Sequence, residues 1–213
     1  MQNPASPHPL LCVPPVTRIE KSRSSEEALS SRSLLKSAIS LVGLPGSGKS
    51  TIGRQLAKRL QSPFADSDAV IEERIGEPIR SFFEREGEPR FRDIEQQLIA
   101  ELMTSPGVIS TGGGAVLRPA NRKLLKAHST VVYLRSSPEE LFKRLRHDKQ
   151  RPLLQVANPL MKLRELHQTR DPLYSETAHF VVDTGRPSLA MLVNTILMQL
   201  ELAGLVETPQ ADS

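Results

Sequence analysis

The chain is poor in cysteine and in large aromatic residues: its 213 residues include one cysteine, no tryptophan and two tyrosines. Because the lone Cys12 has no partner in the chain, an intrachain disulfide is excluded, and a reducing cytosol fits best. Apolar runs are also short, and none approaches the roughly 20 residues that a membrane-spanning helix needs. We therefore expect a cytoplasmic protein without membrane insertion.

A large excess of one charge is missing as well. There are 28 Lys and Arg residues against 24 Asp and Glu residues, which gives a net charge of +4. This excess is too mild and too dispersed for a polybasic nucleic-acid surface. We therefore expect no nucleic-acid partner. The length fits one globular domain that can bury a core without disulfide or metal crosslinks.

The two ends of the chain differ in composition from its middle. Residues 1–36 contain five prolines and a Ser-rich, charged run with almost no apolar periodicity, which predicts a disordered extension. A short transit peptide is the alternative, and the acidic residues Glu20, Glu26 and Glu27 oppose it. We expect the folded domain to span residues 37–204, with a flexible tail at 205–213.

From Ala38 onward, apolar strand candidates alternate with helical segments. This alternation predicts an α/β fold with a parallel sheet and helices on both of its faces. A polar segment at residues 147–152 is too long and too charged for a tight connection, and we interpret it as a mobile lid. The strand candidates are Ala38–Val42, Pro63–Asp66, Gly107–Ser110, Thr130–Leu134 and His179–Asp183. The helical candidates are Ser50–Leu60, Asp93–Met103, Arg118–Lys126, Pro138–Arg146 and a last helix with the apolar stripe Leu189, Leu192, Val193, Ile196, Leu197 and Leu200.

A glycine-rich motif, Gly43-Leu-Pro-Gly-Ser-Gly-Lys-Ser50, lies between the first predicted strand and the first predicted helix. Its backbone N–H groups and the positive end of the helix dipole suit a polyphosphate. In such a loop Lys49 bridges the β- and γ-phosphates, and the Ser50 hydroxyl can bind Mg²⁺. The alternative, a simple strand-to-helix turn, does not explain the full eight-residue match and its flanks. We therefore expect ATP and Mg²⁺ to bind here.

Two carboxylates, Asp66 and Asp68, follow the second predicted strand. If the backbone stays extended, both project to one side, outside the carboxyl end of the sheet where α/β proteins bind ligands. One could then hold a metal-bound water while the other accepts or orients a hydroxyl proton. The alternative is that both are N-cap residues of a helix beginning near Ala69.

Further site candidates are a run of three glycines and two arginines. Three consecutive glycines, Gly112–Gly114, are costly in backbone entropy unless a group must approach the main chain closely; a flexible loop is the alternative. Arg92 and Arg170 are candidates for a clamp that holds a carboxylate by two-pronged hydrogen bonds. Spacing alone does not single them out, because a surface arginine is usually solvated.

Together these motifs resemble the shikimate kinase family over about residues 38–203. The family's motifs occur in the same order, including Arg-Pro-Leu-Leu at residues 151–154, Arg-x-Pro-Leu-Tyr at 170–174 and Val-Asp-Thr at 182–184. The resemblance implies a three-layer α/β/α P-loop kinase fold with a five-stranded parallel sheet in the order 2-3-1-4-5. It also implies a monomer that phosphorylates shikimate with ATP, in the pathway to chorismate and the aromatic amino acids. A gluconate kinase of the same fold and a catalytically silent nucleotide-binding regulator are the alternatives.

The resemblance also assigns roles to residues. The expected catalytic residues are Lys49, Asp68 and Arg151, with Arg151 reaching the phosphates from the lid. Ser50 is expected to bind Mg²⁺ directly, and Asp66 is expected to bind it through water. The expected nucleotide-binding residues are Gly46, Ser47, Gly48, Lys49, Ser50, Thr51, Arg144, Arg151 and Arg186, with Arg144 and Arg186 flanking the adenine. The expected shikimate-binding residues are Asp68, Arg92, Gly112, Gly113, Gly114 and Arg170.

Overall fold

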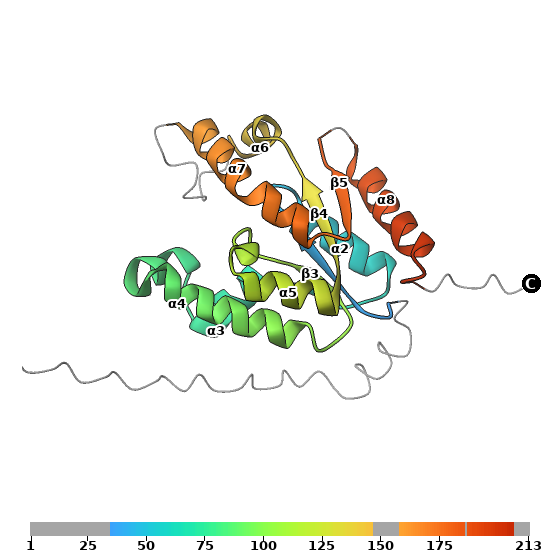
Figure 1. Cartoon of the computed structure of the whole chain (residues 1–213), viewed down its shortest axis with the longest axis horizontal. Coiled ribbons are helices and arrows are strands. Elements are labelled where there is room, and N and C mark those ends of the chain that lie inside the picture. Colours follow the sequence, from blue (N-terminus) through green and yellow to red (C-terminus); the bar gives the residue numbers. More distant parts are fainter. Residues whose placement is uncertain (1–34, 147–157, 186, 207–213) are drawn as a thin grey trace, which may run out of the picture.

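A computed structural model describes residues 35–146, 158–185 and 187–206, in which strands and helices alternate along the chain (Figure 1). The strands are β1 (Ala38–Val42), β2 (Phe64–Asp66), β3 (Val108–Ser110), β4 (Ser129–Arg135) and β5 (Phe180–Asp183). The helices are α2 (Lys49–Arg59), α3 (Ser67–Ile75), α4 (Ile79–Leu102), α5 (Pro119–His128), α6 (Pro138–Leu145), α7 (Pro159–Thr177) and α8 (Leu189–Leu202), with a 3₁₀ turn η1 (Ala115–Leu117).

The five strands form one sheet in the order β2-β3-β1-β4-β5, and every neighbouring pair is parallel. The predicted fold and strand order are therefore confirmed. In the centre of the sheet, Ile39 of β1 pairs with Val108 of β3 and with Thr130 of β4. Because the strands run in one direction, their carboxyl ends share one edge of the sheet, where this class of fold binds ligands.

Helices cover both faces of the sheet (Figure 1). Successive residues of β4 point to opposite faces, as strand geometry requires. Val132 and Leu134 join an apolar cluster with α2 and α8, whereas Val131 and Tyr133 join a second cluster with α5, α6 and α7. The sheet is thus buried on both sides, which explains why its strands are almost continuously apolar.

Helices α3 and α4 form an outlying unit with a small core of its own, centred on Ile71, Phe82 and Phe91. The prediction that a helix begins at Asp93 was wrong, because α4 begins at Ile79. The sequence did not indicate the first part of this helix, because Gly87 and Pro89 interrupt the helical pattern. Gly87 has a non-helical backbone (φ 80°, ψ 165°), and Pro89 lies within the helix. Arg92 therefore lies on a helix that packs against α3.

The folded core extends two residues beyond the predicted 37–204 at each end. Leu35 pairs with Val206 in an isolated antiparallel bridge, and both side chains are buried in the cluster with α8. The apolar stripe of the last helix is confirmed from Leu192 to Leu200, whereas Leu189 is 38% exposed. Residues 1–34 of the predicted extension (1–36), the predicted lid (147–152) and residues 207–213 of the predicted tail (205–213) lie outside the described residues.

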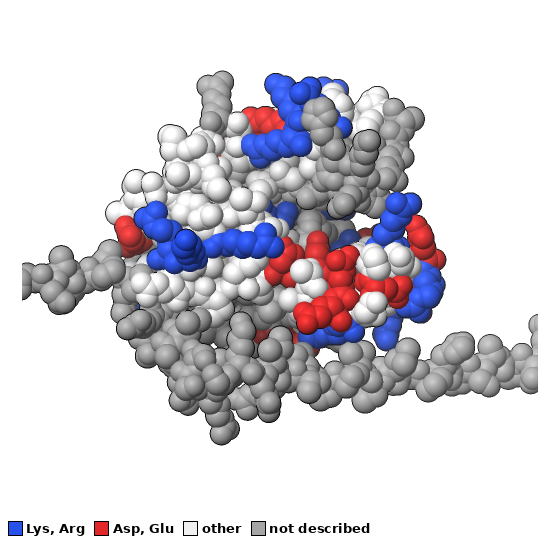
Figure 2. All heavy atoms as spheres, turned by 180° about the vertical axis from the view of Figure 1, so that it is seen from behind, with Lys and Arg blue, Asp and Glu red and all other residues white. Residues whose placement is uncertain are grey.

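The surface agrees with the modest net charge. On the face drawn in Figure 2, Lys and Arg side chains form separate groups between acidic and uncharged side chains. Within the described ranges of the chain, every helix is too short or too polar to cross a membrane.

Candidate active site

The phosphate loop connects β1 to α2 at the carboxyl edge of the sheet. Gly46 and Gly48 both have positive φ values, of 84° and 95°, which side chains rarely adopt. Gly48 is the N-cap of α2, no side chain caps this helix end, and its first turn contains no acidic residue. The N–H donors and the helix dipole at this end are therefore available to an anion.

A polar cavity of about 330 Å³ opens beside this loop. It contains residues from the phosphate loop, from the ends of β2 and β3, and from the glycine run. The lining residues are Pro45, Gly46, Gly48, Lys49, Ser50, Thr51, Asp66, Asp68, Ser110, Thr111, Gly113 and Leu145. The sequence predicts sixteen positions that bind nucleotide, metal or acceptor, and six of these are residues 46–51. All of the six except Ser47 line the cavity, and so do both aspartates.

Lys49 is buried, and its ammonium group donates hydrogen bonds to the carbonyl oxygens of Gly43 (2.8 Å) and Leu44 (3.0 Å). The lysine thus lies along the loop at the cavity wall, where a polyphosphate would meet its charge. Ser47 is also buried, does not line the cavity, and uses its backbone N–H to bond the Leu44 carbonyl (3.1 Å). Its local contact stabilises the turn of the loop.

Three side-chain oxygens meet at the start of α2. The Ser50 hydroxyl donates to Asp66 Oδ2 at 2.5 Å and lies 3.3 Å from the hydroxyl of Ser110. Hard oxygen ligands of this kind, few in number, suit Mg²⁺, which keeps several of its own waters. The predicted pair of Ser50 and Asp66 therefore fits the metal, and Ser110 is an additional oxygen that the sequence did not single out.

The two aspartates reach the cavity by a different route from the one predicted. The strand ends at Asp66, which is the N-cap of α3 and accepts a hydrogen bond from the backbone N–H of Asp68 (3.2 Å). Asp68 lies in the first helical turn, so the condition of an extended backbone through both residues is not met. The N-cap alternative is confirmed for Asp66, and both side chains nevertheless line the cavity.

The pKa of Asp68 is raised above its ordinary value. Burial is the largest cause, followed by the negative charge of Asp66, while Lys49 and Arg92 act in the opposite direction. A carboxylate with a raised pKa is a better proton acceptor than an ordinary aspartate. The positive charges of the phosphate-loop lysine and of one clamp candidate therefore both act on Asp68.

The three glycines are required because side chains of the site press against them. A Cβ on Gly112 would lie 2.5 Å from Asp68 Oδ1, and a Cβ on Gly113 would lie 2.8 Å from Pro45. A Cβ on Gly114 would collide with the guanidinium of Arg92. Positive φ angles are not the reason, because the three glycines have none. Close approach to this main chain is therefore confirmed for side chains of the protein, whereas contact of the glycines with a ligand stays a prediction.

Both clamp candidates lie at the glycine run. Arg92 is largely buried beside Gly114 and donates to Glu95 Oε2 at 2.8 Å. Arg170, on α7, donates to the carbonyl oxygen of Gly113 at 3.0 Å, and the buried Tyr174 donates to the same oxygen at 2.5 Å. The two arginines, from elements far apart in the sequence, therefore converge on one loop next to Asp68.

Sequence reasoning missed Glu95, which is 1% exposed and lies beside Gly112. Burial raises its pKa, and the neighbouring Arg92 partly opposes this rise. Its Oε1 atom is buried without a hydrogen-bond partner among the described residues. The sequence could have indicated Glu95 because it follows Arg92 by three residues, a spacing that places both side chains on one face of a helix.

The expected adenine side of the site is only partly described. Arg144 of α6 donates to the hydroxyl of Thr184 (3.3 Å) and to its carbonyl oxygen, at the end of β5. A second hollow of about 520 Å³ lies nearby, lined by residues that include Glu140, Gly185 and Pro187. Arg151 and Arg186, assigned to the phosphates and the adenine, lie outside the described residues.

A parallel sheet in this order, with a glycine loop and an uncapped helix after its central strand, defines a P-loop kinase. The family model described as shikimate kinase matches residues 45–201. The chain belongs to the shikimate kinase family.

Individual relatives agree with this family. The chain is 59% identical over 172 residues to a shikimate kinase of Paracidovorax citrulli (strain AAC00-1), covering 79% of this chain and 94% of that one. It is 56% identical over 178 residues to a shikimate kinase of Ralstonia nicotianae, covering 83% and 94% of the two chains. Among solved structures, a shikimate kinase from Acinetobacter baumannii in complex with shikimate is 43% identical, with a TM-score of 0.76 and coverage of 84% and 99%.

Proposed function

We propose that this protein transfers the γ-phosphoryl group of ATP to shikimate and produces shikimate 3-phosphate and ADP. The observation that carries the proposal is the convergence of Asp68, Arg92 and Arg170 on Gly112–Gly114, beside the cavity of the phosphate loop. Shikimate is a small polyhydroxylated acid, so one end needs a carboxylate clamp and the other needs a group that orients a hydroxyl. Membership of the shikimate kinase family supports this acceptor.

In the proposed mechanism, Arg92 and Arg170 bind the carboxylate of the acid, since guanidinium groups match carboxylates by two-pronged hydrogen bonds. Asp68 orients the acceptor hydroxyl or takes its proton as the hydroxyl oxygen bonds to the γ-phosphorus. The bond from that phosphorus to the bridging oxygen breaks, and ADP leaves. Such transfer depends on in-line positioning and charge neutralisation more than on covalent chemistry by the protein.

The nucleotide is placed by the phosphate loop. Backbone donors from Gly46 to Thr51 bind the phosphates, and Lys49 stabilises the charge on the transferred group. Ser50, and Asp66 through water, would hold Mg²⁺, with Ser110 close by. When bound, Mg²⁺ neutralises charge on phosphate oxygens. Arg144 and Arg186 are assigned to the adenine, and Arg151 to the phosphates from the lid.

A coupled ADP-release assay tests the proposal. Purified protein, ATP and Mg²⁺ are incubated with shikimate, with gluconate and without an acceptor, and each reaction is repeated with EDTA. We expect fast ADP release only in the reaction that contains shikimate, and we expect EDTA to abolish that release. Turnover with gluconate in place of shikimate would establish the other small-metabolite kinase, and no turnover with any acceptor would establish a silent nucleotide-binding protein.

The location and the assembly state are also proposals. The single cysteine supports a reducing cytosol, and family likeness supports a monomer. Size-exclusion chromatography with light scattering checks the second: a mass near 23.6 kDa is expected.

A further inference from the structure

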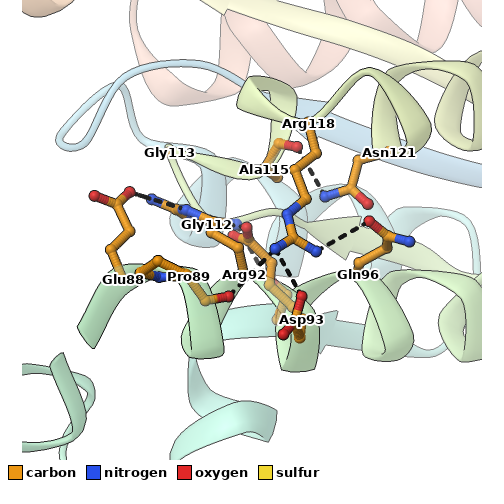
Figure 3. A network of polar contacts seen from close by, with 12 residues as sticks. Glu88, Pro89, Arg92, Asp93, Gln96, Gly112, Gly113, Ala115, Arg118 and Asn121 are labelled. Atoms are coloured by element: carbon orange, nitrogen blue, oxygen red, sulfur yellow. Dashed lines mark hydrogen bonds and ion pairs between the residues drawn. The ribbon is translucent and has the colours of Figure 1, made fainter. Parts of the chain in front are cut away.

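Arg118 connects two parts of the acceptor side of the site (Figure 3). It lies between η1, which follows the glycine run, and α5, and its guanidinium reaches across to α4. There it donates to Asp93 Oδ1 at 2.7 Å, to the carbonyl oxygen of Pro89 at 3.2 Å and to Gln96 Oε1 at 3.2 Å. One side chain thus contacts three acceptors spaced four and three residues apart, on one face of the helix.

The contacted part of α4 is the part that carries Arg92. The helix is interrupted at Gly87, so Pro89 lies near the start of the second segment, and Arg92 lies between Pro89 and Asp93. A helix start after such an interruption lacks the support of a preceding helical turn. Phe91 of this segment packs in the core with Ile71, and the hydrogen bonds from Arg118 add a connection from the segment to the end of η1. This connection sets the place of the segment, and with it the Arg92 guanidinium, relative to the glycine run.

The other end of the connection is equally well held. Backbone N–H groups of Ala115 and Leu117 donate to the carbonyl oxygens of Gly112 (3.1 Å) and Gly114 (3.0 Å), which links the glycine run to η1. From α5, the buried Asn121 donates to the carbonyl oxygen of Ala115 at 3.0 Å (Figure 3). The backbone between Gly112 and Arg118 is therefore a braced segment.

An ordinary surface ion pair is the alternative, since Asp93 is 49% exposed. Two observations oppose it. Only one of the three acceptors is charged, and an isolated charge attraction does not require a backbone carbonyl and an amide as further acceptors. The Arg118 side chain is also 29% exposed, so most of it is enclosed between α4 and η1.

We propose that Arg118 is a positioning residue that fixes Arg92 relative to Gly112–Gly114 and so sets the affinity for the acceptor acid. The proposal rests on the proposed function, in which Arg92 binds the carboxylate. Arg118 itself does not contact the acid. Removing it should loosen the clamp without altering the phosphate loop, because the elements it joins are on the acceptor side of the cavity.

The test compares Arg118→Gln, Arg118→Lys and the control Arg74→Gln. Arg74, on α3, donates two hydrogen bonds to the carboxylate of Glu101, at distances of 2.6 and 3.1 Å. Glu101 lies near the C-terminal end of α4, the helix that Arg118 contacts near Arg92. For Arg118→Gln we expect KM for shikimate to rise about fivefold, the scale of lost hydrogen bonds, with kcat and KM for ATP within about twofold of the wild type. Arg118→Lys keeps the charge but cannot reach three acceptors, so it should show the same rise. Arg74→Gln should leave kcat, KM for shikimate and KM for ATP unchanged.

Backbone hydrogen exchange gives a readout that does not depend on turnover. In the free protein, Arg118→Gln should speed the exchange of amides between Glu88 and Gln96, whereas Arg74→Gln should speed it only near Glu101. Wild-type protein that does not phosphorylate shikimate would defeat the proposed function alone, and the exchange pattern would still decide on the connection. Unchanged exchange between Glu88 and Gln96, an equal KM shift in the Arg74 variant, or full restoration of KM by lysine would overturn the inference.

Discussion

At the scale of single residues, the chemistry of the site depends on how burial and neighbouring charges modify a few side chains. Asp68 shows this most clearly, because burial raises its pKa while Lys49 and Arg92 limit the rise. The Asp68 carboxylate is therefore the proposed proton acceptor, and it feels the positive charges of the two groups proposed to bind ATP and the acid. The place of Asp68 in the candidate site could be predicted from the sequence, but its altered pKa could not, because burial is a property of the folded chain.

Asp68→Asn should lower kcat by about 10²- to 10⁴-fold, the usual contribution of a positioned base, while ATP affinity changes little. The wild-type enzyme needs the deprotonated carboxylate. Since the pKa of Asp68 is raised, activity should begin to fall at a higher pH than an ordinary aspartate, with its pKa of 3.8, would cause. The measurements are the pH profile of kcat/KM and a nucleotide titration. A variant that retains the acidic limb of the wild type would contradict this assignment.

At the scale of elements, the glycine run is a surface against which the site is assembled. The sequence indicated a close approach to Gly112–Gly114, and the structure identifies the approaching groups as Asp68, Pro45 and Arg92. Helix α4 was harder to predict, because Gly87 and Pro89 interrupt the signal of its first part. The contacts of Glu95 and Tyr174 with the site were also missed, since they depend on which helix face packs toward the loop.

Gly112→Ala should lower kcat/KM for shikimate by about 10- to 100-fold, because the added methyl group would overlap Asp68 and Glu95. Gly107→Ala, just before β3, is the matched control. A Cβ at Gly107 would lie 3.3 Å from its nearest neighbour, the carbonyl oxygen of Pro63. Steady-state kinetics and thermal melting of both variants provide the measurement. Equal losses of activity in the two variants would show a general effect on the strand and not a local one.

Strand β5 carries a pH-sensitive contact at its start. Nδ1 of His179 accepts a hydrogen bond from the backbone N–H of Val131 (3.0 Å), and burial together with the charge of Lys126 lowers the pKa of His179. A lowered pKa means that folding favours the neutral ring. This stabilisation is present above the unfolded pKa of about 6.5 and is lost as the pH falls toward the folded value.

His179→Gln should therefore reduce the difference in Tm between pH 8 and pH 5, because it removes the group that must be neutral. Calorimetric melting of the wild type and the variant at both pH values tests this. If the variant loses as much Tm on acidification as the wild type, other groups cause the acid sensitivity.

At the scale of the whole molecule, the sheet and the site have a common origin. The parallel order places the ends of β1, β2 and β3 at one edge, so residues from three separate segments line one cavity. The strand order was available from the sequence only through the family resemblance, whereas the α/β class followed from the alternation of apolar strands and helices. The bridge between Leu35 and Val206 could not be predicted, because it joins residues at opposite ends of the domain.

A chain that lacks residues 1–33 should retain the wild-type kcat and KM values, since the proposed catalytic residues and the family match lie later in the sequence. Adding Leu35→Ala to this shortened chain should lower Tm by about 5 °C, because Leu35 is buried against Val206. Melting curves and ADP-release rates of the two chains are the measurements. A loss of activity on shortening alone would assign the extension a part in catalysis.

The most direct test of the account is the change in Michaelis constants caused by Arg92→Lys, measured with shikimate and ATP varied in turn. A lysine cannot make the two-pronged bond to a carboxylate, so KM for shikimate should rise about tenfold or more while KM for ATP stays within about twofold of the wild type. A rise in KM for ATP with an unchanged KM for shikimate would contradict the carboxylate clamp and leave nucleotide binding as the supported function.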